Sequence, residues 1–485
     1  MNKIWFWDLE TLDIFTATFV AKDENDNTTR TFVISKTKDE RRELFSFLEN
    51  EVDVLIGYNS IFFDAQIIEY MYRYPECTAK QIKSYAGIIT SDNNRRPEVP
   101  ERKLRHRHVD LFKALSLSTK AKMTGLKWCE FMIDFENIED LPSDGEGNTW
   151  EEQVLSYNLN DVLATKALFY KYKYEVDLRN TLSYREKVNL LNSTEPDMAK
   201  KLFAKYLSKA MKISEYDLRS MGTERDVVEI KDIILPYTEY KTPALQEVLE
   251  DFKKLSLGRE DKFEKVVNLG GIDITFALGG IHGSVKASKV DSTDTETIES
   301  LDVQSFYPNL AIRNGWHPDH LPKEIFCNLY ESFFDERKSI PKSDPRNYIL
   351  KILLNSAYGM TNDKFSFLRD RQMTLAICIN GQILLTMLFE ELLESIPGSR
   401  LIMINTDGGE ILFENKYKPL YDEICKKWEE KTKLVLEFDE YKKLIVRDVN
   451  CWRLNLVNCW NPKLKNKAIS SQALFNREGS ETIEI

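Results

Sequence analysis

The sequence predicts a multidomain protein in which an α/β region is followed by an α+β region. Three observations indicate this. The chain has 485 residues, which is too long for a single hydrophobic core. Strand-like and helix-like stretches alternate over the first 175 residues. Beyond residue 263, apolar strands and a hairpin flank a pair of long helices.

Composition narrows the class of protein. We find no apolar run long enough to span a bilayer, and the N-terminus predicts a strand and not a signal peptide, so we expect a cytoplasmic protein. Seven cysteines without a CxxC pair and five scattered histidines argue against structural zinc. The net charge of −11 does not exclude DNA binding, because a cleft can be locally basic on an acidic body. His106 and His108 lie in the basic run RKLRHRH, which indicates a solvated or DNA-facing loop.

The first elements follow from composition and periodicity. Residues 3–36 predict three strands, because they are rich in aromatic and β-branched residues. A helix is expected over 39–50, a strand over 52–59 and a second helix over 62–74. This order favours a mixed sheet with helices against it.

Four acidic residues of this region form a candidate metal site. Asp8 and Glu10 are two apart on a strand and therefore face the same side, while Asp64 stands at a helix start. Asp161 follows Tyr157 by four residues, which puts both on one helix face. Four carboxylates suit a two-metal nuclease, with the tyrosine orienting the attacking water. The alternative is a set of surface acids on ordinary elements.

Other parts of the first 262 residues have structural interpretations. HVDLF (108–112) and GLKWCEF (125–131) predict a further strand and helix, and we interpret Asp110 as structural or outer-shell. SDGEGNTW (143–150) predicts a polar loop. The stretch from about 175 to 262 is mostly helical and charged, which is typical of a connecting module.

LDVQSFYPNL (301–310) is the strongest candidate for nucleotide chemistry. An apolar strand ends at Asp302, and a turn with Ser305, Phe306 and Tyr307 follows. A carboxylate at a strand end can hold a metal, and the backbone N–H groups of a tight turn can hold phosphate oxygens. We expect the amides of Gln304, Ser305 and Phe306 to do so.

A helix pair follows this strand. One helix is expected over 321–340 with Arg337 at its end, and a second one carries Lys351, Asn355 and Tyr358 at i, i+4 and i+7. Such a hairpin could close over a nucleotide, with the two cations neutralising a triphosphate and the tyrosine stacking near the nascent pair. The alternative is a helix pair whose polar residues face solvent.

Two glycine-containing hairpins complete the set. RLIMINTDGGEILF (400–413) is an apolar strand, an Asp-Gly turn and an apolar strand, and it brings Asp407 toward Asp302. FALGGIHGS (276–284) predicts either a turn between strands or a loop that a template strand approaches closely. A last strand pair supplies Lys442, Lys443 and Arg447 for primer phosphates.

Together these motifs resemble a family B DNA polymerase of the phage type fused to a 3′–5′ proofreading exonuclease, from residue 3 to about 452. LDVQSFYP is similar to the family motif Asp-x-x-Ser-Leu-Tyr-Pro, and KILLNSAYG matches Lys-x-x-x-Asn-Ser-x-Tyr-Gly. NTDG resembles Asp-Thr-Asp, while FWDLET, NSIFFD and YNLND match the three exonuclease motifs. With the glycine loop, seven motifs occur in the family's order.

The resemblance implies a domain plan. Its parts are an RNase H-like exonuclease domain (1–175), a helical connecting module (176–262), an antiparallel palm (263–320 and 360–452), a helical-hairpin fingers insertion (321–359) and a short segment (453–485) in place of a thumb. It implies template-directed synthesis with proofreading in viral DNA replication, in the host cytoplasm and without a membrane. The partners would be primer–template DNA and dNTPs, with a separate chain supplying a thumb or clamp as an alternative.

The resemblance also implies residue roles. Asp302 and Asp407 would hold the polymerase metals, and Tyr307 would exclude a ribose 2′-OH. Each active site would hold two Mg²⁺ ions, or Mn²⁺, with Asp8, Glu10, Asp64 and Asp161 binding those of the exonuclease. We further expect DNA contacts from a set of loop and strand residues: Asn59, Phe63, Gly279, Gly280, Gly359, Thr406, Lys442 and Arg447.

The sequence departs from the family pattern at four places. Asn405 stands where the family often has the first Asp of Asp-Thr-Asp, and Ala277 replaces the tyrosine of Tyr-x-Gly-Gly. RDVNCW replaces Lys-Lys-x-Tyr, and few residues follow Trp452. Two other functions therefore stay open: a nuclease whose palm binds primer–template without extending it, and a non-enzymatic nucleic-acid clamp.

Overall fold

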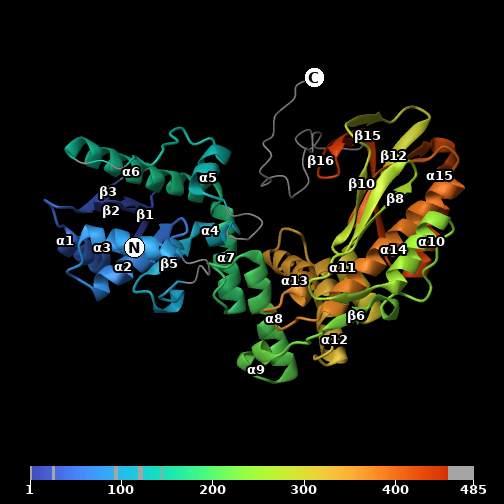
Figure 1. Ribbon diagram of the computed structural model, residues 1–485, viewed down its shortest axis with the longest axis horizontal. Helices are drawn as coiled ribbons and strands as arrows, with labels where there is room; N and C mark the ends of the chain where they lie inside the picture. The colour runs from blue at the N-terminus through green and yellow to red at the C-terminus, as the bar shows by residue number, and fades with distance from the viewer. Residues whose placement is uncertain are drawn as a thin grey trace. The chain divides into compact units, whose positions relative to one another are not determined.

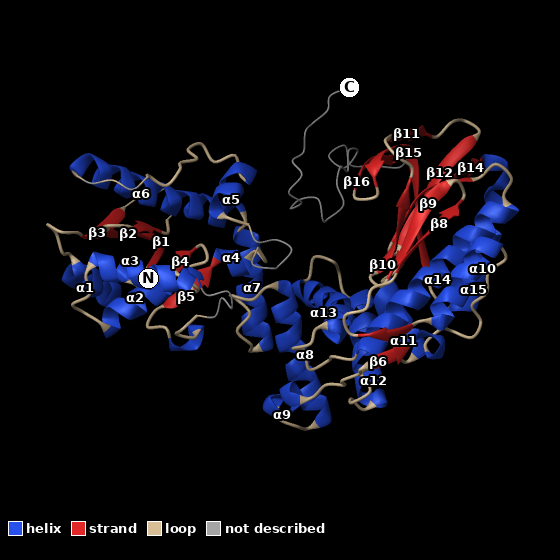
Figure 2. Cartoon of the chain, viewed as in Figure 1, coloured by secondary structure: helices blue, strands red, loops and turns tan. Residues whose placement is uncertain are grey.

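The computed structural model describes residues 3–23, 28–91, 97–117, 124–143, 145 and 147–456. The chain divides into two compact units, Met1–Met198 and Ala199–Ile485, which we call unit 1 and unit 2. Each unit contains helices and a sheet, which confirms the mixed α/β multidomain class (Figure 2). Most of the expected short C-terminal segment, and two positions of the polar loop at 143–150, lie outside the described residues.

Unit 1 is built on a five-stranded sheet of order β3-β2-β1-β4-β5. The first three strands are antiparallel, and β4 and β5 continue in parallel from β1. The three predicted N-terminal strands are thereby confirmed. The strand predicted at 108–112 is confirmed as far as Asp110, and Leu111 begins a short helix instead. The strands are β1 (Ile4–Thr11), β2 (Phe15–Ala21), β3 (Thr29–Ile34), β4 (Val54–Gly57) and β5 (Arg107–Asp110).

Helices cover both faces of this sheet (Figure 1). The long helix α6 lies along β1 and β2, and α1 and α3 lie on the other side. A core of aromatic and aliphatic side chains, including Trp7, Phe15 and Phe19, fills the space between. The helices are α1 (Arg41–Glu51), α2 (Asp64–Arg73), α3 (Ala79–Ser91), η1 (Glu101–Lys103), α4 (Leu111–Ala114), α5 (Leu126–Met132), α6 (Asn148–Lys171) and α7 (Lys173–Glu186).

Unit 2 is built on a nine-stranded antiparallel sheet. Its order is β11-β15-β12-β14-β13-β10-β9-β8, with β16 paired to β15. The central strands β12 and β14 are the ones predicted to carry the acidic motifs. The strands are β8 (Glu264–Leu269), β9 (Ile272–Ala277), β10 (Gly280–Ser284), β11 (Ser288–Asp291), β12 (Glu296–Val303), β13 (Arg400–Asn405), β14 (Gly408–Glu414), β15 (Leu436–Asp448) and β16 (Cys451–Leu456). A separate pair consists of β6 (Val227–Glu229) and β7 (Ser256–Gly258).

The helix hairpin predicted in unit 2 is confirmed, and side-chain caps define its second helix and the next one. Asp344 accepts the Arg346 N–H at the start of α13, and Asp370 accepts the Gln372 N–H at the start of α14. The remaining helices are α8 (Glu195–Met211), α9 (Glu215–Ser220), η2 (Ile230–Asp232), α10 (Pro243–Lys254), α11 (Phe306–Asn314), α12 (Lys323–Ser339), α13 (Pro345–Asn362), α14 (Arg371–Ser395), η3 (Asn415–Tyr417) and α15 (Lys418–Thr432).

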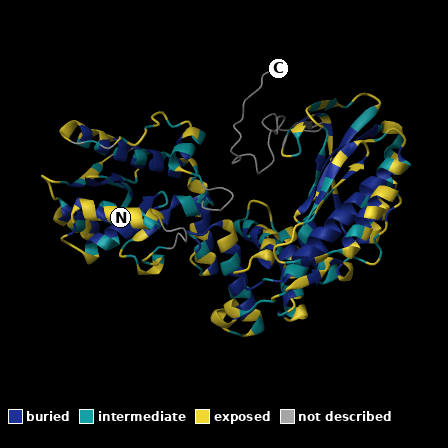
Figure 3. Cartoon of the chain, viewed as in Figure 1, coloured by how far each residue is buried: buried dark blue, intermediate teal, exposed yellow. Residues whose placement is uncertain are grey.

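Helix α14 corrects one expectation from the sequence. It is long and apolar enough to cross a bilayer, although no such run was recognised in the sequence. However, 89% of its most apolar window is buried inside the protein (Figure 3). The same helix contacts β10, β13 and the helices α11, α13 and α15. Its hydrophobicity is therefore explained by its place in the core of unit 2.

Candidate active sites

The acidic cluster of unit 1 forms where β1 and α6 meet. Strand alternation directs Asp8 and Glu10 to one face of β1, and α6 brings Asp161 to the same place. One ligand atom from each of these three residues lies within 4.8 Å of the others, a spacing that suits metal binding. No other trio in the described ranges has this spacing. Asp64, the first residue of α2, is near enough to raise the pKa of both Asp8 and Glu10.

Burial raises the pKa of every acid in this cluster. Burial is the largest cause throughout, and the neighbouring carboxylates add to it for Asp8 and Glu10. The pKa rises to about 8 for Glu10 and for Asp64, and to about 6 for Asp161, while that of Asp8 lies well above its ordinary value. A divalent cation would relieve this repulsion, so the donor set fits a hard metal ion such as Mg²⁺.

Two neighbours on α6 hold the carboxylates in place. Tyr157 is hydrogen-bonded to Asp161, as the i, i+4 spacing predicts, and this contact lowers the pKa of the acid. Asn158 donates from Nδ2 to Asp8 Oδ2 at 2.8 Å. The sequence analysis did not single out this asparagine, because it lies off the Tyr157–Asp161 face of the helix.

Asp110, a buried acid outside this cluster, supports the loop that leads to α2. Asp110 is fully buried and accepts the N–H groups of Asn59 (2.9 Å), Ile61 (3.1 Å) and Phe112 (3.1 Å). Asn59 has a φ of 57°, so this hydrogen bond helps to hold a left-handed residue. The structural interpretation of Asp110 is confirmed.

Glu130 on α5 is a buried acid that the sequence analysis did not identify. It is 1% exposed, and neither carboxylate oxygen has a hydrogen-bond partner among the described residues. Burial and Asp161 raise its pKa to about 7. Nothing in its local sequence distinguishes it from a surface glutamate, because only the packing of α5 against α6 buries it.

The acids of unit 2 meet at the end of the central strands. Asp302 is near the end of β12, and Asp407 stands in the turn between β13 and β14, where its carbonyl accepts the Val303 N–H at 2.8 Å. Gly408 lies opposite Asp302 in the strand register. A Cβ at Gly408 would come within 2.0 Å of Asp302 Oδ1, so only glycine allows this approach.

The pKa shifts of Asp302 and Asp407 resemble those of the acids in unit 1, although both residues are exposed. Of the two, Asp407 lines the cavity beside them. Burial of its inner side raises the pKa of Asp302 to about 6, with contributions from Asp407, Asp439 and Glu437. Burial also raises the pKa of Asp407. The sequence analysis had not assigned the two acids of β15 to this site.

Glu410 is a further acid of the same hairpin. It is 6% exposed, and burial together with Asp302 raises its pKa to about 8. Ser300 Oγ donates to its Oε1 at 3.5 Å, and its Oε2 has no partner within the described part of the chain. The sequence places it inside an apolar strand, where an acid is expected only if something pairs with it.

Asn405, the residue that departs from the family pattern, has a structural role. Its Oδ1 lies 2.8 Å from His282 Nδ1 and also accepts the Thr406 hydroxyl at 3.1 Å. These contacts join β13 to β10 across the sheet. The amide therefore ties the turn to its neighbour strand, and its oxygen is already occupied.

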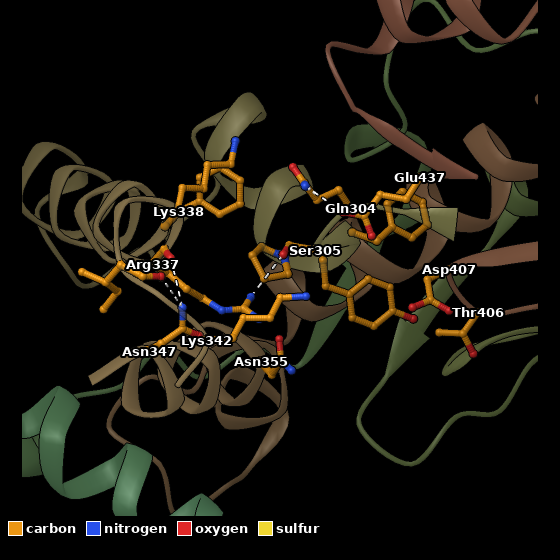
Figure 4. A pocket seen from close by; sticks show the side chains of 15 residues that line it. Gln304, Ser305, Arg337, Lys338, Lys342, Asn347, Asn355, Thr406, Asp407 and Glu437 are labelled. Carbon is orange, nitrogen blue, oxygen red and sulfur yellow. Dashed lines mark hydrogen bonds between the residues drawn. The ribbon is translucent and has the colours of Figure 1, made fainter. Parts of the chain in front are cut away.

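A cavity of about 610 Å³ opens beside Asp407 (Figure 4). The ends of α12 and α13 supply one wall, and the turn after β12 supplies the other. Arg337 and Lys342 point into the space between them, and Arg337 Nη1 lies 3.5 Å from Ser305 Oγ. The lining residues are Gln304, Ser305, Phe306, Tyr307, Pro308, Phe334, Arg337, Lys338, Ile340, Lys342, Asn347, Asn355, Thr406, Asp407 and Glu437.

The cavity agrees with some of the predicted nucleotide contacts and differs from others. Ser305 has a φ of 46° and precedes the first turn of α11, and Ser305, Phe306 and Tyr307 all line the cavity. The Gln304 N–H is already bonded to the Val435 carbonyl at 2.9 Å, so the expectation that it holds phosphate is wrong. Lys351 is exposed on α13 and does not line the cavity, whereas Lys342 does.

Tyr307 lies in a contact network beside this cavity. Its ring is 4.7 Å from that of Tyr358, whose hydroxyl lies 2.7 Å from Cys378 Sγ. The Tyr307 hydroxyl is 3.5 Å from the Gly279 carbonyl in the β9–β10 turn. Cys378 Sγ also lies 3.7 Å from that carbonyl, so the network fixes the tyrosine pair against the glycine turn.

The glycine loop forms the turn between β9 and β10 that one of the two interpretations predicted. Gly280 has a φ of 155°, and a Cβ there would meet only ordinary contacts beyond 3.5 Å. Gln382 Nε2 of α14 donates to the Ala277 carbonyl at 2.8 Å. This backbone contact does not use the side chain of residue 277, so the alanine is compatible with a fixed loop.

The remaining predicted DNA contacts lie in varied surroundings. Gly359 and Lys442 are exposed, whereas Phe63 is partly buried against the core of unit 1. Arg447 is paired with Asp448 at 2.8 Å, and Lys443 with Asp291 at 3.4 Å, which reduces the charge that either offers to a phosphate.

Unit 1 thus contains three carboxylates at a spacing that suits a metal ion, and unit 2 contains two strand-end acids with a basic cavity beside one of them. Comparison with known proteins adds no family to this description. No protein-family model matches the chain, and no curated protein matches it significantly.

Proposed function

We propose that this protein is a template-directed DNA polymerase with a 3′–5′ proofreading exonuclease, each activity using two Mg²⁺ ions. The observation that carries the proposal is the pairing, in unit 2, of adjacent strand-end acids with a cavity lined by cations. Asp302 and Asp407 would hold the metals. Arg337, Lys338 and Lys342 would neutralise the phosphates of a dNTP, whose size suits a cavity of about 610 Å³.

The antiparallel sheet and helix hairpin of unit 2 support the interpretation as palm and fingers. The 3′-hydroxyl of a primer would lose its proton to solvent and attack the α-phosphate of the dNTP in line, and the bond to the β-phosphate would break to release pyrophosphate. Bound metals would supply stabilisation of the charge on the attacking and leaving oxygens. The chain's own contribution is to position the metals and the triphosphate. Tyr307, braced by Tyr358, would stand where a ribose 2′-OH would otherwise fit.

Unit 1 supports the exonuclease part of the proposal. Its mixed five-stranded sheet is compatible with an RNase H-like domain. Asp8, Glu10 and Asp161 would share metal ions with Asp64, and Tyr157 would orient the attacking water beside Asp161. When bound, the metal ions would supply an activated water and stabilise the charge that develops on the phosphate.

Primer extension with the two reciprocal variants tests the proposal. We expect Asp8→Ala to extend a labelled primer on a template, with Mg²⁺ and four dNTPs, without shortening it. We expect Asp302→Ala to shorten the primer without extending it. Asp294→Ala, which removes an exposed acid from the β11–β12 turn, is the matched control and should keep both activities. Extension by Asp302→Ala would refute the assignment of unit 2.

A nuclease with an inactive palm is the second candidate. Degradation by the unmodified chain, together with no extension by Asp8→Ala, would favour it. Such a result would direct the search toward a separate chain that supplies a thumb or clamp.

A further inference from the structure

Unit 1 contains a second cavity whose lining includes no residue of the acidic cluster. It has a volume of about 840 Å³ and lies between the segment 100–108, which includes the start of β5, and the end of α7. Its lining combines basic and polar side chains with a few apolar ones: Pro100, Glu101, Arg102, Leu104, Arg105, His106, Arg107, His108, Asn180, Ser183, Tyr184, Lys187, Val188, Asn189, Leu191 and Asn192. The basic run in the sequence, RKLRHRH, forms one wall of it.

The positive charge of this cavity is largely unbalanced. Arg102, Arg107 and Lys187 are exposed, and none has an ion-pair partner among the described residues. Arg105 is paired with Glu69 at 3.4 Å. Glu101 is the one acid in the lining. On a chain with a net charge of −11, three unpaired cations around one cavity indicate an anionic ligand.

Two histidines of the lining, His106 and His108, have buried ring nitrogens, and the His108 ring lies 5.6 Å from that of Trp7. His108 is 8% exposed, and burial lowers the pKa of His106 and that of His108, which falls to about 3. Both rings are therefore neutral at pH 7. His106 Nε2 and His108 Nδ1 have no partner in the parts of the chain that the structure describes. Such buried, unsatisfied nitrogens are expected where a ligand completes the hydrogen bonds.

Asn192, itself a lining residue, joins the wall of this cavity to the loop that precedes Asp64. Its Nδ2 donates to Glu101 Oε1 and to the His108 carbonyl, each at 2.8 Å, and its Oδ1 accepts the Asp110 N–H at 2.8 Å. Asp110 in turn holds the N–H groups of Asn59 and Ile61, just before Asp64. The cavity and the metal-binding residues thus share one rigid support.

We propose that this cavity binds the sugar–phosphate backbone of single-stranded DNA. Arg102, Arg107 and Lys187 contact successive phosphates, and Tyr184, a lining residue that is 87% exposed, stacks on a base. A rim tyrosine can stack only on a base that is not already paired and stacked within a duplex, which selects the single strand. The choice of DNA over another polyanion rests on the proposed exonuclease function.

Salt-dependent binding of a labelled oligothymidylate, measured by fluorescence anisotropy in EDTA, tests the proposal. The triple variant Arg102→Ala, Arg107→Ala, Lys187→Ala removes three phosphate contacts. Each contact contributes about 0.7 to the slope of log K against log salt concentration for single strands, so the slope should fall by about 2. The lysine-for-arginine variant Arg102→Lys, Arg107→Lys should keep the slope.

The matched control removes three exposed cations of unit 1 outside the cavity, by Arg30→Ala, Arg42→Ala and Lys80→Ala. It changes the net charge equally, and its slope should stay near that of the unmodified chain. Tyr184→Ala should weaken binding about fivefold or more without changing the slope, because it removes stacking and no charge.

Equal slopes for the cavity variant and the control would overturn the proposal, and so would an unchanged affinity in Tyr184→Ala. These outcomes are distinguishable from failure of the proposed function. If the chain degrades DNA with Mg²⁺ but the two variants show equal slopes, the exonuclease proposal stands and the proposal for the cavity is refuted. If the slope falls in the cavity variant and not in the control, but the unmodified chain degrades no DNA, the proposal for the cavity stands and the exonuclease proposal is refuted.

Discussion

Replacing Asp64 by asparagine tests whether this buried acid of the unit 1 cluster both destabilises the metal-free protein and contributes to metal binding. Asp64 is 4% exposed, and burial is the main reason that its pKa rises to about 8. Asparagine has nearly the same shape and keeps an oxygen acceptor, but it carries no charge. The variant should therefore stabilise the metal-free protein while it weakens metal binding.

The size and sign of the effect follow from the pKa. Because the folded pKa lies above the ordinary value of 3.8, the stability linked to this group is complete below pH 4 and is lost as pH rises to about 8. A gap of about four pKa units at about 1.4 kcal/mol each gives an upper bound of about 6 kcal/mol. Relaxation around the charge reduces this, so we expect a gain of a few kcal/mol in Asp64→Asn at pH 8 and almost none at pH 4.

Thermal unfolding in EDTA and in Mg²⁺ measures both consequences. In EDTA at pH 8, Asp64→Asn should unfold at a higher temperature than the unmodified chain, and the difference should shrink toward pH 4. Added Mg²⁺ should stabilise the unmodified chain more than the variant. Glu76→Gln, which neutralises an exposed acid of the same unit, should change neither result. A variant that is less stable in EDTA at pH 8, or that gains as much from Mg²⁺, would refute this reasoning.

Three further predictions concern unit 2. Gly408→Ala places a Cβ 2.0 Å from Asp302 Oδ1, so the Asp302 carboxylate must move away. Misplacing this carboxylate should reduce primer extension on the order of a hundredfold, while exonuclease activity stays. Cys378→Ala loosens the network that fixes Tyr307, so misincorporation of ribonucleotides should rise while dNTP extension changes little; Cys327→Ala, outside the network, should leave both unchanged. Because the pKa of Asp302 is about 6 without a cation, protons should compete with Mg²⁺ below that pH, and the Mg²⁺ concentration needed for half-maximal extension should rise as pH falls from 7 to 5.

Local periodicity explains why much of unit 1 could be predicted. Strand alternation is sufficient to place Asp8 and Glu10 on one face, and a spacing of four residues is sufficient to join Tyr157 to Asp161. Neither inference requires knowledge of the tertiary fold. The burial of Glu130 requires it, because only the packing of α5 against α6 removes that side chain from water.

The same distinction applies to unit 2. The Asp-Gly hairpin was predictable from its turn chemistry and its apolar flanks. The side of α13 that faces the cavity was not, because periodicity groups Lys351 with Asn355 but does not fix how the helix is rotated against α12. In the structure Asn355 lines the cavity and Lys351 does not. Lys342 lines the cavity instead. It lies in the connection between α12 and α13, where helical periodicity gives no information about which way a side chain points.

The segment from Asn405 to Glu410 shows how a motif can lose one acid and still leave an acidic site. Asn405 uses its oxygen to hold His282 and the turn, so a metal ligand at that position would have to give up these contacts. Two glycines follow Asp407, and the first allows Asp302 to approach the hairpin. Glu410 adds a buried carboxylate to the same hairpin, and it lies close enough to Asp302 for the charge of Asp302 to raise the pKa of Glu410. We therefore expect cation binding in unit 2 to depend on Glu410 as well as on the two strand-end aspartates, although Asn405 supplies no charge.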